Sequence, residues 1–286
     1  MTTTHHPTLV AAVDQLPADP ARVMDSWWFT ARLKAADTVF WAKIHAMTVQ
    51  GTAHSTVALM REPGGHSSRQ QSTDSPDEVT LATSILDIRT PILDIRGDLD
   101  AIAITGATDT GSLQLTLRRD EPVLYNGGSG LFPFFGGTTG QYSLPGLTTS
   151  GTLTADGTTY EVRGRTWFDR QWGTPGTEPP RFTWLGLDLG GGRYLSVWDT
   201  TGDGTSWLTE LAADGTHTIT RAHRIERNGG WTLTVPRFEG ALEIDHRGLP
   251  DSNDGLYAGV CEVMGTFAGE DIVGHGYVDI VSQAPA

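Results

Sequence analysis

The chain has 286 residues, which is enough for one large hydrophobic core or two of medium size. Its 34 acidic and 20 basic residues give a formal net charge of -14, which disfavours nucleic acid and anionic membrane surfaces as partners. The single cysteine, Cys261, has no second cysteine for an intramolecular disulfide or a thiolate metal site, so we expect a reducing, cytoplasmic setting.

Residues 1–24 are predicted to form a segment that precedes the first domain. They lack the basic start and the long apolar run of a secretion signal. Asp19 and Pro20 have the residue types of a helix cap and a first turn, so we expect a helix over residues 17–25. Charged, Gly or Pro residues interrupt every apolar stretch of the chain, so we expect no insertion into a membrane.

Residues 25–150 are predicted to form an N-terminal β-domain. In DSWWFTARL (25–33), a strand would send Trp27 and Trp28 to opposite faces, one into a core and the other toward a second layer, a cavity or solvent. In VFWAKIHAMTV (39–49), Trp41, Lys43 and His45 share a face. A Lys and a His that face a cavity could polarise a carbonyl, although the outer face of a barrel is the more common place for such a pair.

Three further segments of this domain carry local signals. The polar stretch 61–78 is expected to be an exposed loop, with a polar strand over 68–73 as the alternative. The repeat SILDIRT and PILDIRG (84–97) predicts two successive strands that are broken at Pro91. The Gly-flanked segment 125–137 contains Phe132 and Phe134, which would either form a lid over a lipophilic ligand or, as we favour, plug an interface between domains.

Residues 151–286 are predicted to form a C-terminal β-domain, with the boundary in the polar, turn-rich stretch 146–160. Short apolar segments alternate with Asp-Gly and Asn-Gly steps, which is typical of antiparallel hairpins. DLGGGRY (188–194) lacks the spacing of a phosphate-binding loop and leads into a strand, so it predicts a hairpin turn. Apart from His5 and His6 near the start, the histidines show no HExxH or close paired spacing, and no nucleophile elbow occurs, so neither a metal site nor a serine hydrolase is indicated.

The segment GRTWFDRQWG (164–173) carries the strongest candidate for chemistry. In an extended strand its side chains divide between two faces, Trp167, Asp169 and Gln171 on one and Phe168, Arg170 and Trp172 on the other. An aspartate among aromatic neighbours loses water, and this raises its pKa toward the range of a general acid. The alternative is that Asp169 forms a structural ion pair with Arg165 or Arg193.

This segment and its flanks resemble a lipocalin-like family that includes carotenoid 1,2-hydratases, bacterial AttH-type proteins and, more distantly, fungal decalin-forming Diels-Alderases. The resemblance lies in the string Gly-x-x-Trp-x-Asp-x-x-Trp-Gly from Gly164 to Gly173, and in FTWLGLDLGGGRYLSVWD (182–199). DSWWFTARL, YSLPGLTTSGTL (142–153) and GLYAGVCEVMGTFAGEDIVGHGYVDIV (255–281) extend it. It therefore touches most of residues 25–282.

The resemblance implies an all-β fold of two lipocalin-like (calycin) antiparallel barrel or sandwich domains packed side by side. It implies a ligand pocket at their junction, an unsaturated lipophilic substrate and no cofactor. In the hydratases an acid protonates an alkene, and Asp169 matches that position. The chain departs from the family where an acidic residue often follows the tyrosine at Tyr257, and where a Glu often stands at Asp279. The missing acid weakens the hydratase interpretation.

Our leading hypothesis from the sequence is therefore a cofactor-independent cyclase or isomerase of the Diels-Alderase type that acts on a lipophilic polyene or polyketide-derived intermediate. The alternatives are a hydratase with Asp169 as proton donor and a non-catalytic carrier of a hydrophobic ligand. The predicted catalytic residues are Asp169, Tyr257 and His45. The predicted substrate-binding residues are aromatic, namely Trp27, Trp28, Trp41, Phe132, Phe134, Trp167, Trp184 and Trp198.

Overall fold

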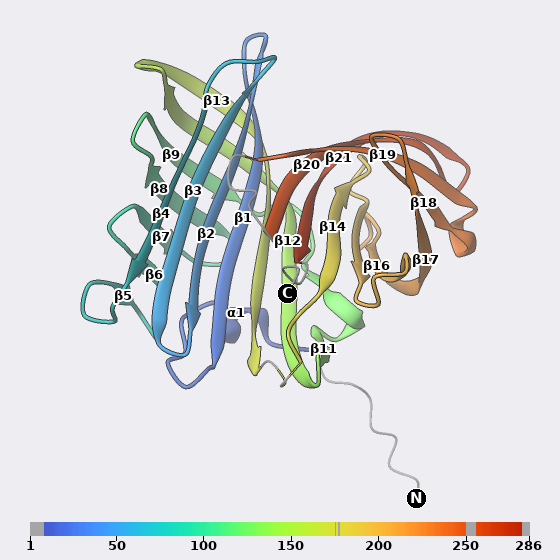
Figure 1. Cartoon of the computed structure of the whole chain (residues 1–286), viewed down its shortest axis with the longest axis horizontal. Coiled ribbons are helices and arrows are strands. Elements are labelled where there is room, and N and C mark those ends of the chain that lie inside the picture. The colour runs from blue at the N-terminus through green and yellow to red at the C-terminus, as the bar shows by residue number, and fades with distance from the viewer. Residues whose placement is uncertain (1–8, 175, 177, 250–255, 282–286) are drawn as a thin grey trace, which may run out of the picture.

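The computed structural model of the chain describes residues 9–174, 176, 178–249 and 256–281. It contains two β-sheets that lie side by side, an open 13-stranded sheet and a closed eight-stranded barrel (Figure 1). The all-β prediction and the prediction of two adjacent β-domains are confirmed. Within the described residues, no helix is long and apolar enough to cross a membrane.

The open sheet is antiparallel, and its strands run in the order β4-β3-β2-β1-β13-β12-β9-β8-β7-β6-β5, with β10 and β11 also paired to β12. Its longer strands are β1 (Met24–Ala35), β2 (Thr38–Val49), β3 (Thr52–Glu62), β4 (Ser67–Asp74), β8 (Ala101–Ala107), β9 (Gly111–Arg118), β12 (Gly137–Ala155) and β13 (Thr158–Thr174). Its shorter strands are β5 (Thr80–Leu81), β6 (Leu86–Arg89), β7 (Leu93–Gly97), β10 (Leu124–Tyr125) and β11 (Leu131–Phe134).

The open sheet curls around a core of its own. Phe29 and Phe168 stack at 4.3 Å in this core, which also takes Ile44 and Val57 from one half of the sheet and Ile104 from the other. The alternation of buried and exposed residues along strands such as β8 places these side chains on one face. These side chains cover one face of the open sheet. Part of its opposite face contacts the barrel.

The barrel strands follow one another in chain order, and β21 closes the barrel by pairing with β14. The strands are β14 (Phe182–Asp188), β15 (Tyr194–Asp199), β16 (Thr205–Leu211), β17 (His217–Arg227), β18 (Gly230–Val235), β19 (Gly240–Gly248), β20 (Leu256–Phe267) and β21 (Glu270–Val281). Its interior is filled by aliphatic side chains such as Leu208, Leu233 and Val263, together with Phe267 and the buried Cys261. The barrel interior is a packed core.

The chain passes from the open sheet to the barrel between Thr174 and Phe182. The polar, turn-rich stretch near residues 146–160 instead forms the hairpin between β12 and β13, in which Asp156 and Gly157 adopt positive φ. The expected boundary at 150/151 therefore falls within β12, because turn chemistry marks a hairpin inside a sheet as readily as a linker between sheets.

Local predictions had mixed outcomes. The helix expected over 17–25 is wrong, because the α-helix α1 covers Ala12–Gln15 and Asp19 instead closes a turn by accepting from the backbone of Ala21 at 3.0 Å. For the polar stretch 61–78, the alternative of a strand over 68–73 is confirmed, because β4 covers Ser67–Asp74. The two strands broken at Pro91 are confirmed as β6 and β7, and the hairpin turn at 188–194 joins β14 to β15.

Two 3₁₀ helices complete the structure, η1 (Asn126–Gly128) beside β10 and η2 (Pro236–Phe238) before β19. The aromatic segment around η1 and β11 lies in the junction between the sheets, where Phe132 packs on Trp207 with ring centroids 5.1 Å apart. This position agrees with the prediction that Phe132 and Phe134 fill an interface between the domains.

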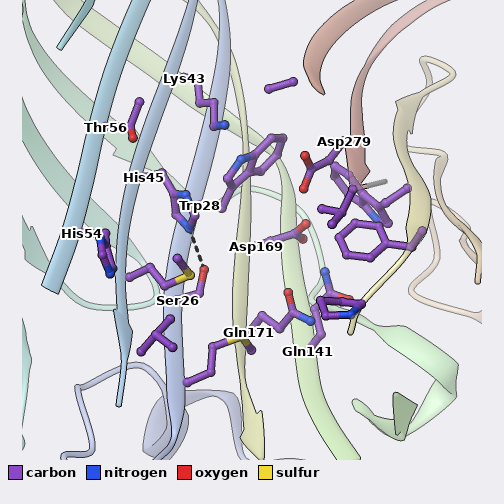
Figure 2. A pocket seen from close by; sticks show the side chains of 18 of the residues that line it. Ser26, Trp28, Lys43, His45, His54, Thr56, Gln141, Asp169, Gln171 and Asp279 are labelled. Carbon is purple, nitrogen blue, oxygen red and sulfur yellow. Dashed lines mark hydrogen bonds between the residues drawn. The ribbon is translucent and has the colours of Figure 1, made fainter. Parts of the chain in front are cut away.

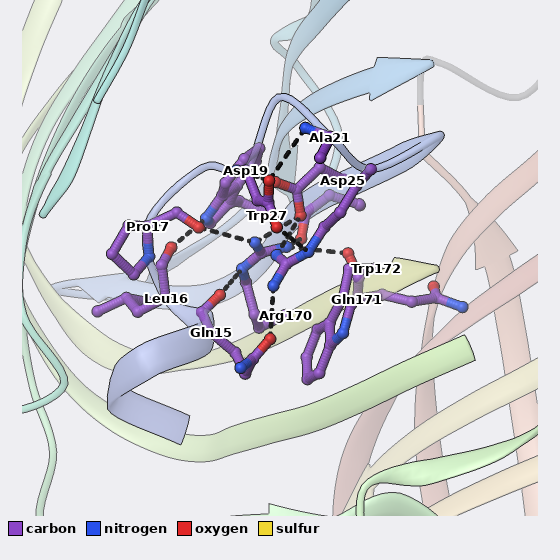
Figure 3. Close-up of polar contacts among 12 residues, drawn as sticks. Gln15, Leu16, Pro17, Asp19, Ala21, Asp25, Trp27, Arg170, Gln171 and Trp172 are labelled. Carbon is purple, nitrogen blue, oxygen red and sulfur yellow. Dashed lines mark hydrogen bonds and ion pairs between the residues drawn. The ribbon is translucent and has the colours of Figure 1, made fainter. Parts of the chain in front are cut away.

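The two faces of β13 contact different parts of the protein, as the alternation predicted. Arg170 points away from the barrel and is fully buried beneath α1 and the following turn (Figure 3). It forms an ion pair with Asp25 on β1, and its guanidinium donates to the backbone oxygens of Gln15 and Pro17 at 2.6 and 3.0 Å. The guanidinium also lies 4.2 Å from the ring of Trp27. This face of β13 anchors the N-terminal segment.

Candidate functional site

A cavity of about 600 Å³ lies where the open sheet meets the barrel. Strands β1 to β4 and β13 supply one side of it, and β14, β15, β20 and β21 supply the other (Figure 2). A pocket of this size at the junction of two domains accommodates a small organic ligand. The cavity is therefore the candidate active site.

Aromatic side chains form the apolar part of the cavity wall. Trp28 of β1 meets Trp184 of β14 edge to face, with ring centroids 5.2 Å apart. Trp198 lies 6.4 Å from Trp184 and 5.6 Å from Phe134, and Phe182 completes the group at 5.1 Å from Trp198. These rings meet edge to face or at a tilt, and the electrostatics of aromatic rings favour such contacts. The wall is thus rigid and suited to a flat or unsaturated ligand.

The structure places the predicted aromatic residues unequally. Trp28, Phe134, Trp184 and Trp198 line the cavity. Trp41, Phe132 and Trp167 belong to the same buried junction cluster but lie behind the cavity lining. Trp27 is in the core of the open sheet, where its indole N–H donates to the backbone oxygen of Leu16 at 2.8 Å.

Asp169 is buried at the cavity wall and is held by neutral donors. The hydroxyl of Ser143 on β12 and the indole N–H of Trp167, at 2.9 Å, both donate to its Oδ1, and Gln141 adds a further hydrogen bond. The structural ion pair that we had considered for Asp169 is wrong: Arg165 donates to the backbone of Gly146, and Arg193 pairs with glutamates near the barrel rim. Asp169 is therefore positioned by hydrogen bonds that leave its charge uncompensated.

Burial raises the pKa of Asp169 to about 7, against the opposing effect of the hydrogen bonds from Ser143, Trp167 and Gln141. The negative charge of Asp279 is a smaller contribution to this raised pKa. Asp279 lies on β21, in register with Trp184, and it lines the cavity beside Asp169 (Figure 2). At neutral pH Asp169 thus holds a proton for much of the time, as a general acid requires.

His45 lines the cavity from β2, where it is half-buried. Burial, with smaller contributions from the nearby Lys43 and His54, lowers its pKa to about 3. Its Nε2 lies 2.9 Å from the hydroxyl oxygen of Ser26 on β1. His45 is therefore a neutral hydrogen-bonding group at neutral pH, and of the two positions considered for Lys43 and His45 the structure shows the cavity.

Tyr257 contributes to the cavity rim, but its hydroxyl is used elsewhere. It packs against the barrel core, and its oxygen lies 2.7 Å from Nδ1 of His246 on β19. His246 in turn stacks on Trp231 with ring centroids 4.0 Å apart. Burial raises the pKa of Tyr257 to about 12, so the phenol stays protonated. The three predicted catalytic residues thus share one cavity, with Asp169 and His45 on the open sheet and Tyr257 on the barrel.

Sequence reasoning missed several polar residues of the site. Ser143, Gln141 and Ser26 reach the cavity region because β12, β13 and β1 are adjacent, and cross-strand register pairs Ser143 with Asp169 and Gln141 with Gln171. Asp279 was noted only as a departure from a family pattern. None of these residues stands in a recognisable motif, since their proximity depends on the pairing of strands far apart in the chain.

Among the described residues, no three His, Cys, Asp or Glu side chains lie close enough together to hold a metal ion. The cavity instead offers a carboxyl pair, a neutral imidazole and amide side chains. This donor set suits proton transfer and hydrogen bonding.

The fold and the cavity can be compared with known proteins. The profile of the AttH-like family matches residues 14–237, which include the open sheet and much of the barrel. This chain belongs to the AttH-like family. The resemblance drawn from GRTWFDRQWG and its flanks is thereby confirmed.

Sequence comparison identifies two relatives whose names refer to the removal or addition of water. The dehydratase asqC of Emericella nidulans is 28% identical over 203 residues, which make up 59% of this chain and 58% of that protein. Kievitone hydratase of Fusarium solani subsp. phaseoli is 31% identical over 106 residues, 35% of this chain and 30% of that protein. The matched region therefore spans less than two thirds of either relative.

Solved structures share the fold over nearly the whole chain. Kievitone hydratase from Nectria haematococca has a TM-score of 0.84 at 19% identity, with 98% of this chain and 95% of that chain covered. CghA with Sch210972 has a TM-score of 0.55 at 14% identity, with 95% and 97% covered. At these identities the likeness shows the arrangement of the two sheets.

Proposed function

We propose that this protein is a hydro-lyase, an enzyme that adds water to an alkene of a lipophilic substrate or eliminates it in the reverse reaction. The observation that carries the proposal is the buried carboxyl of Asp169, whose pKa is raised to about 7 at the wall of an aromatic cavity. The names of the relatives asqC and kievitone hydratase support the same class of reaction. The structure thus moves our preference from the cyclase hypothesis to the hydratase hypothesis.

In the hydration direction, the Oδ–H of Asp169 donates its proton to one alkene carbon, and a water oxygen bonds to the other carbon. The water then gives a proton to a carboxylate, either Asp169 or the neighbouring Asp279, so that the net change is the addition of one water molecule. The indole N–H of Trp167 and the hydroxyl of Ser143 stabilise the carboxylate that forms after donation. The aromatic rings of Trp28 and Trp184 face the positive charge that develops on carbon.

A shape-driven cyclase of the Diels-Alderase type is the second candidate, and the mutually braced aromatic wall favours it. Holding two reacting ends of one chain in contact removes up to about 7–11 kcal/mol of barrier without proton transfer. In that case enlargement of the cavity by Trp184→Ala lowers the rate more than Asp169→Asn does. A carrier would bind ligand with nearly equal affinity before and after Asp169→Asn.

The test is an assay of the purified protein with a panel of lipophilic alkenes and alcohols, with kievitone, the compound in the name of one relative, as its first member. Mass spectrometry distinguishes the products, because hydration adds the mass of water and cyclisation adds nothing. We expect Asp169→Asn to lower the rate by about 10²–10⁴-fold, the usual contribution of a general acid. Asp120→Asn is the matched control, since Asp120 is exposed and outside the cavity lining.

Two results would count against the hydro-lyase. One is a product of unchanged mass, and the other is a hydration rate that Asp169→Asn leaves within a few-fold of the unsubstituted protein. For a hydro-lyase we also expect the rate to fall as pH rises through about 7, because the folded protein then loses the proton of Asp169.

A further inference from the structure

The part of the cavity wall formed by β2, β3 and β4 differs in charge from the rest. Its polar side chains are Lys43, His45, His54, Thr56, Arg69 and Gln71. The two carboxylates among the described lining residues, Asp169 and Asp279, come from β13 and β21 (Figure 2). The cavity therefore has a basic, hydrogen-bonding side and an acidic, aromatic side, although the chain as a whole has a net charge of -14.

Arg69 on β4 is the distinctive residue of the basic side. It is half-buried, and its Nε is buried without a hydrogen-bond acceptor. No ion pair involves it within the part of the chain that the structure describes. A guanidinium has five N–H donors in a planar fork that fits a carboxylate or a similar anion. An arginine at a cavity wall with an unused donor favours a ligand that brings the acceptor.

A second basic residue, Lys43, belongs to the same part of the cavity wall as Arg69. Cross-strand register pairs Arg69 with Ala58 on β3 and Ala58 with Lys43 on β2, so the two cations lie in one row across the sheet. With strands about 4.8 Å apart, Lys43 and Arg69 stand about 10 Å from each other, separated by the small side chain of Ala58. Lys43 and His54 both line the cavity, and both contribute to lowering the pKa of His45.

We propose that Arg69 binds an anionic oxygen group of the substrate, such as a carboxylate, enolate or phenolate, while the reacting alkene lies at Asp169. The assignment of the reacting end rests on the proposed function. Strands β4 and β13 are four positions apart in the sheet, so the two ends are separated by about 19 Å measured along the curved wall. The substrate class is thus an amphipathic acid that carries its anionic group away from its reacting alkene, and a hydrocarbon polyene does not use this wall.

The test compares two fluorescent probes that share a ring framework and differ in charge, 8-anilinonaphthalene-1-sulfonate and neutral N-phenyl-1-naphthylamine. Titrations of each probe are made with the unsubstituted protein, Arg69→Gln and Arg69→Lys. Arg61→Gln is the matched control, because Arg61 is also half-buried on the neighbouring strand β3 but pairs with Asp156 outside the cavity.

We expect Arg69→Gln to weaken binding of the sulfonate at least 10-fold and binding of the neutral probe less than 2-fold, with Arg69→Lys between the two for the sulfonate. Arg61→Gln should change neither. Equal weakening of both probes would overturn the proposal, since Arg69 would then only shape the cavity, and so would an unchanged affinity for the sulfonate. Neither probe is turned over, so this result is independent of the activity test on Asp169.

Discussion

Replacement of Asp169 by asparagine tests the electrostatics of the site without any knowledge of the substrate. Asparagine has nearly the shape of a protonated aspartate but does not titrate. Burial is the chief reason why the pKa of Asp169 rises from its ordinary 3.8 to about 7 in the folded protein. This difference between the folded and unfolded states corresponds to roughly 4 kcal/mol of stability.

The sign of the effect follows from proton linkage. Between pH 4 and pH 7 the unfolded chain releases the proton of Asp169 while the folded chain keeps it, so the folded state loses stability as pH rises through this window. Below pH 4 both states are protonated, and above pH 7 both are ionised. The Asp169→Asn variant avoids this loss. Relative to the unsubstituted protein, it should gain up to about 4 kcal/mol of stability between pH 4 and pH 8.

The assay is urea unfolding of both proteins at pH 4 and pH 8, followed by circular dichroism, with the change in the stability difference as the measured quantity. Other titrating groups are common to both proteins and largely cancel in that difference. Asp120→Asn, at an exposed position, should show no pH-dependent difference. A stability difference for Asp169→Asn that stays constant within about 1 kcal/mol between the two pH values would refute the raised pKa, and with it the proposed acid.

Three further predictions concern residues that support the site. The unsubstituted protein should lose stability as pH falls from 6.5 toward 3, because burial lowers the pKa of His45 to about 3, and His45→Gln should remove this loss. The test is the difference in melting temperature between the two proteins at pH 5 and at pH 7, and an equal difference at both pH values would contradict the prediction. Arg170→Met should cost roughly 3–5 kcal/mol in urea unfolding, because it removes a buried arginine from Asp25, which then keeps only Arg22, and takes the donor from the backbone oxygens of Gln15 and Pro17. A cost below about 1 kcal/mol would show that Arg170 is dispensable. Gly186→Ala should disturb the aromatic junction seen by near-ultraviolet circular dichroism, since its Cβ would lie 2.6 Å from Trp184 and 3.0 Å from Trp167. Gly202→Ala strains its turn, because Gly202 has a φ of +77°, but its Cβ would meet nothing within 4 Å, so it should leave that spectrum unchanged.

The strand periodicity of the sequence was enough to predict much of the site. Alternation along β13 predicted that Asp169 and Gln171 share a face and that Arg170 points the other way, and both line up as expected in the structure. The hairpins were predictable too, because Asp-Gly and Gly-Gly steps provide the positive φ that tight turns need, as at Gly190 and Gly191. These features depend on a few neighbouring residues.

Which tryptophans reach the ligand was not predictable in the same way. Alternation showed that Trp27 and Trp28 face opposite directions, but only the docking of the barrel on one side of β1 decides that Trp28 meets the cavity and Trp27 meets the core. Trp167 shares the face of Asp169, yet the ring of Trp184 covers it with centroids 5.8 Å apart, and it acts as a donor to Asp169. Such distinctions come from contacts between segments that are distant in sequence.

The acidity of the candidate catalytic group is a property of the junction between the sheets. Asp169 belongs to the open sheet, but Asp279, whose charge raises its pKa, belongs to the barrel, as does Trp184, which covers Trp167. The same carboxyl on a sheet face exposed to water would keep an ordinary pKa and would be ionised at neutral pH. Docking of the barrel therefore removes water from the carboxyl, adds the second carboxylate and supplies most of the aromatic wall in one event. Under the proposed function, a change on the barrel strands would therefore reset the pKa of Asp169 without any change in β13, the strand that bears it.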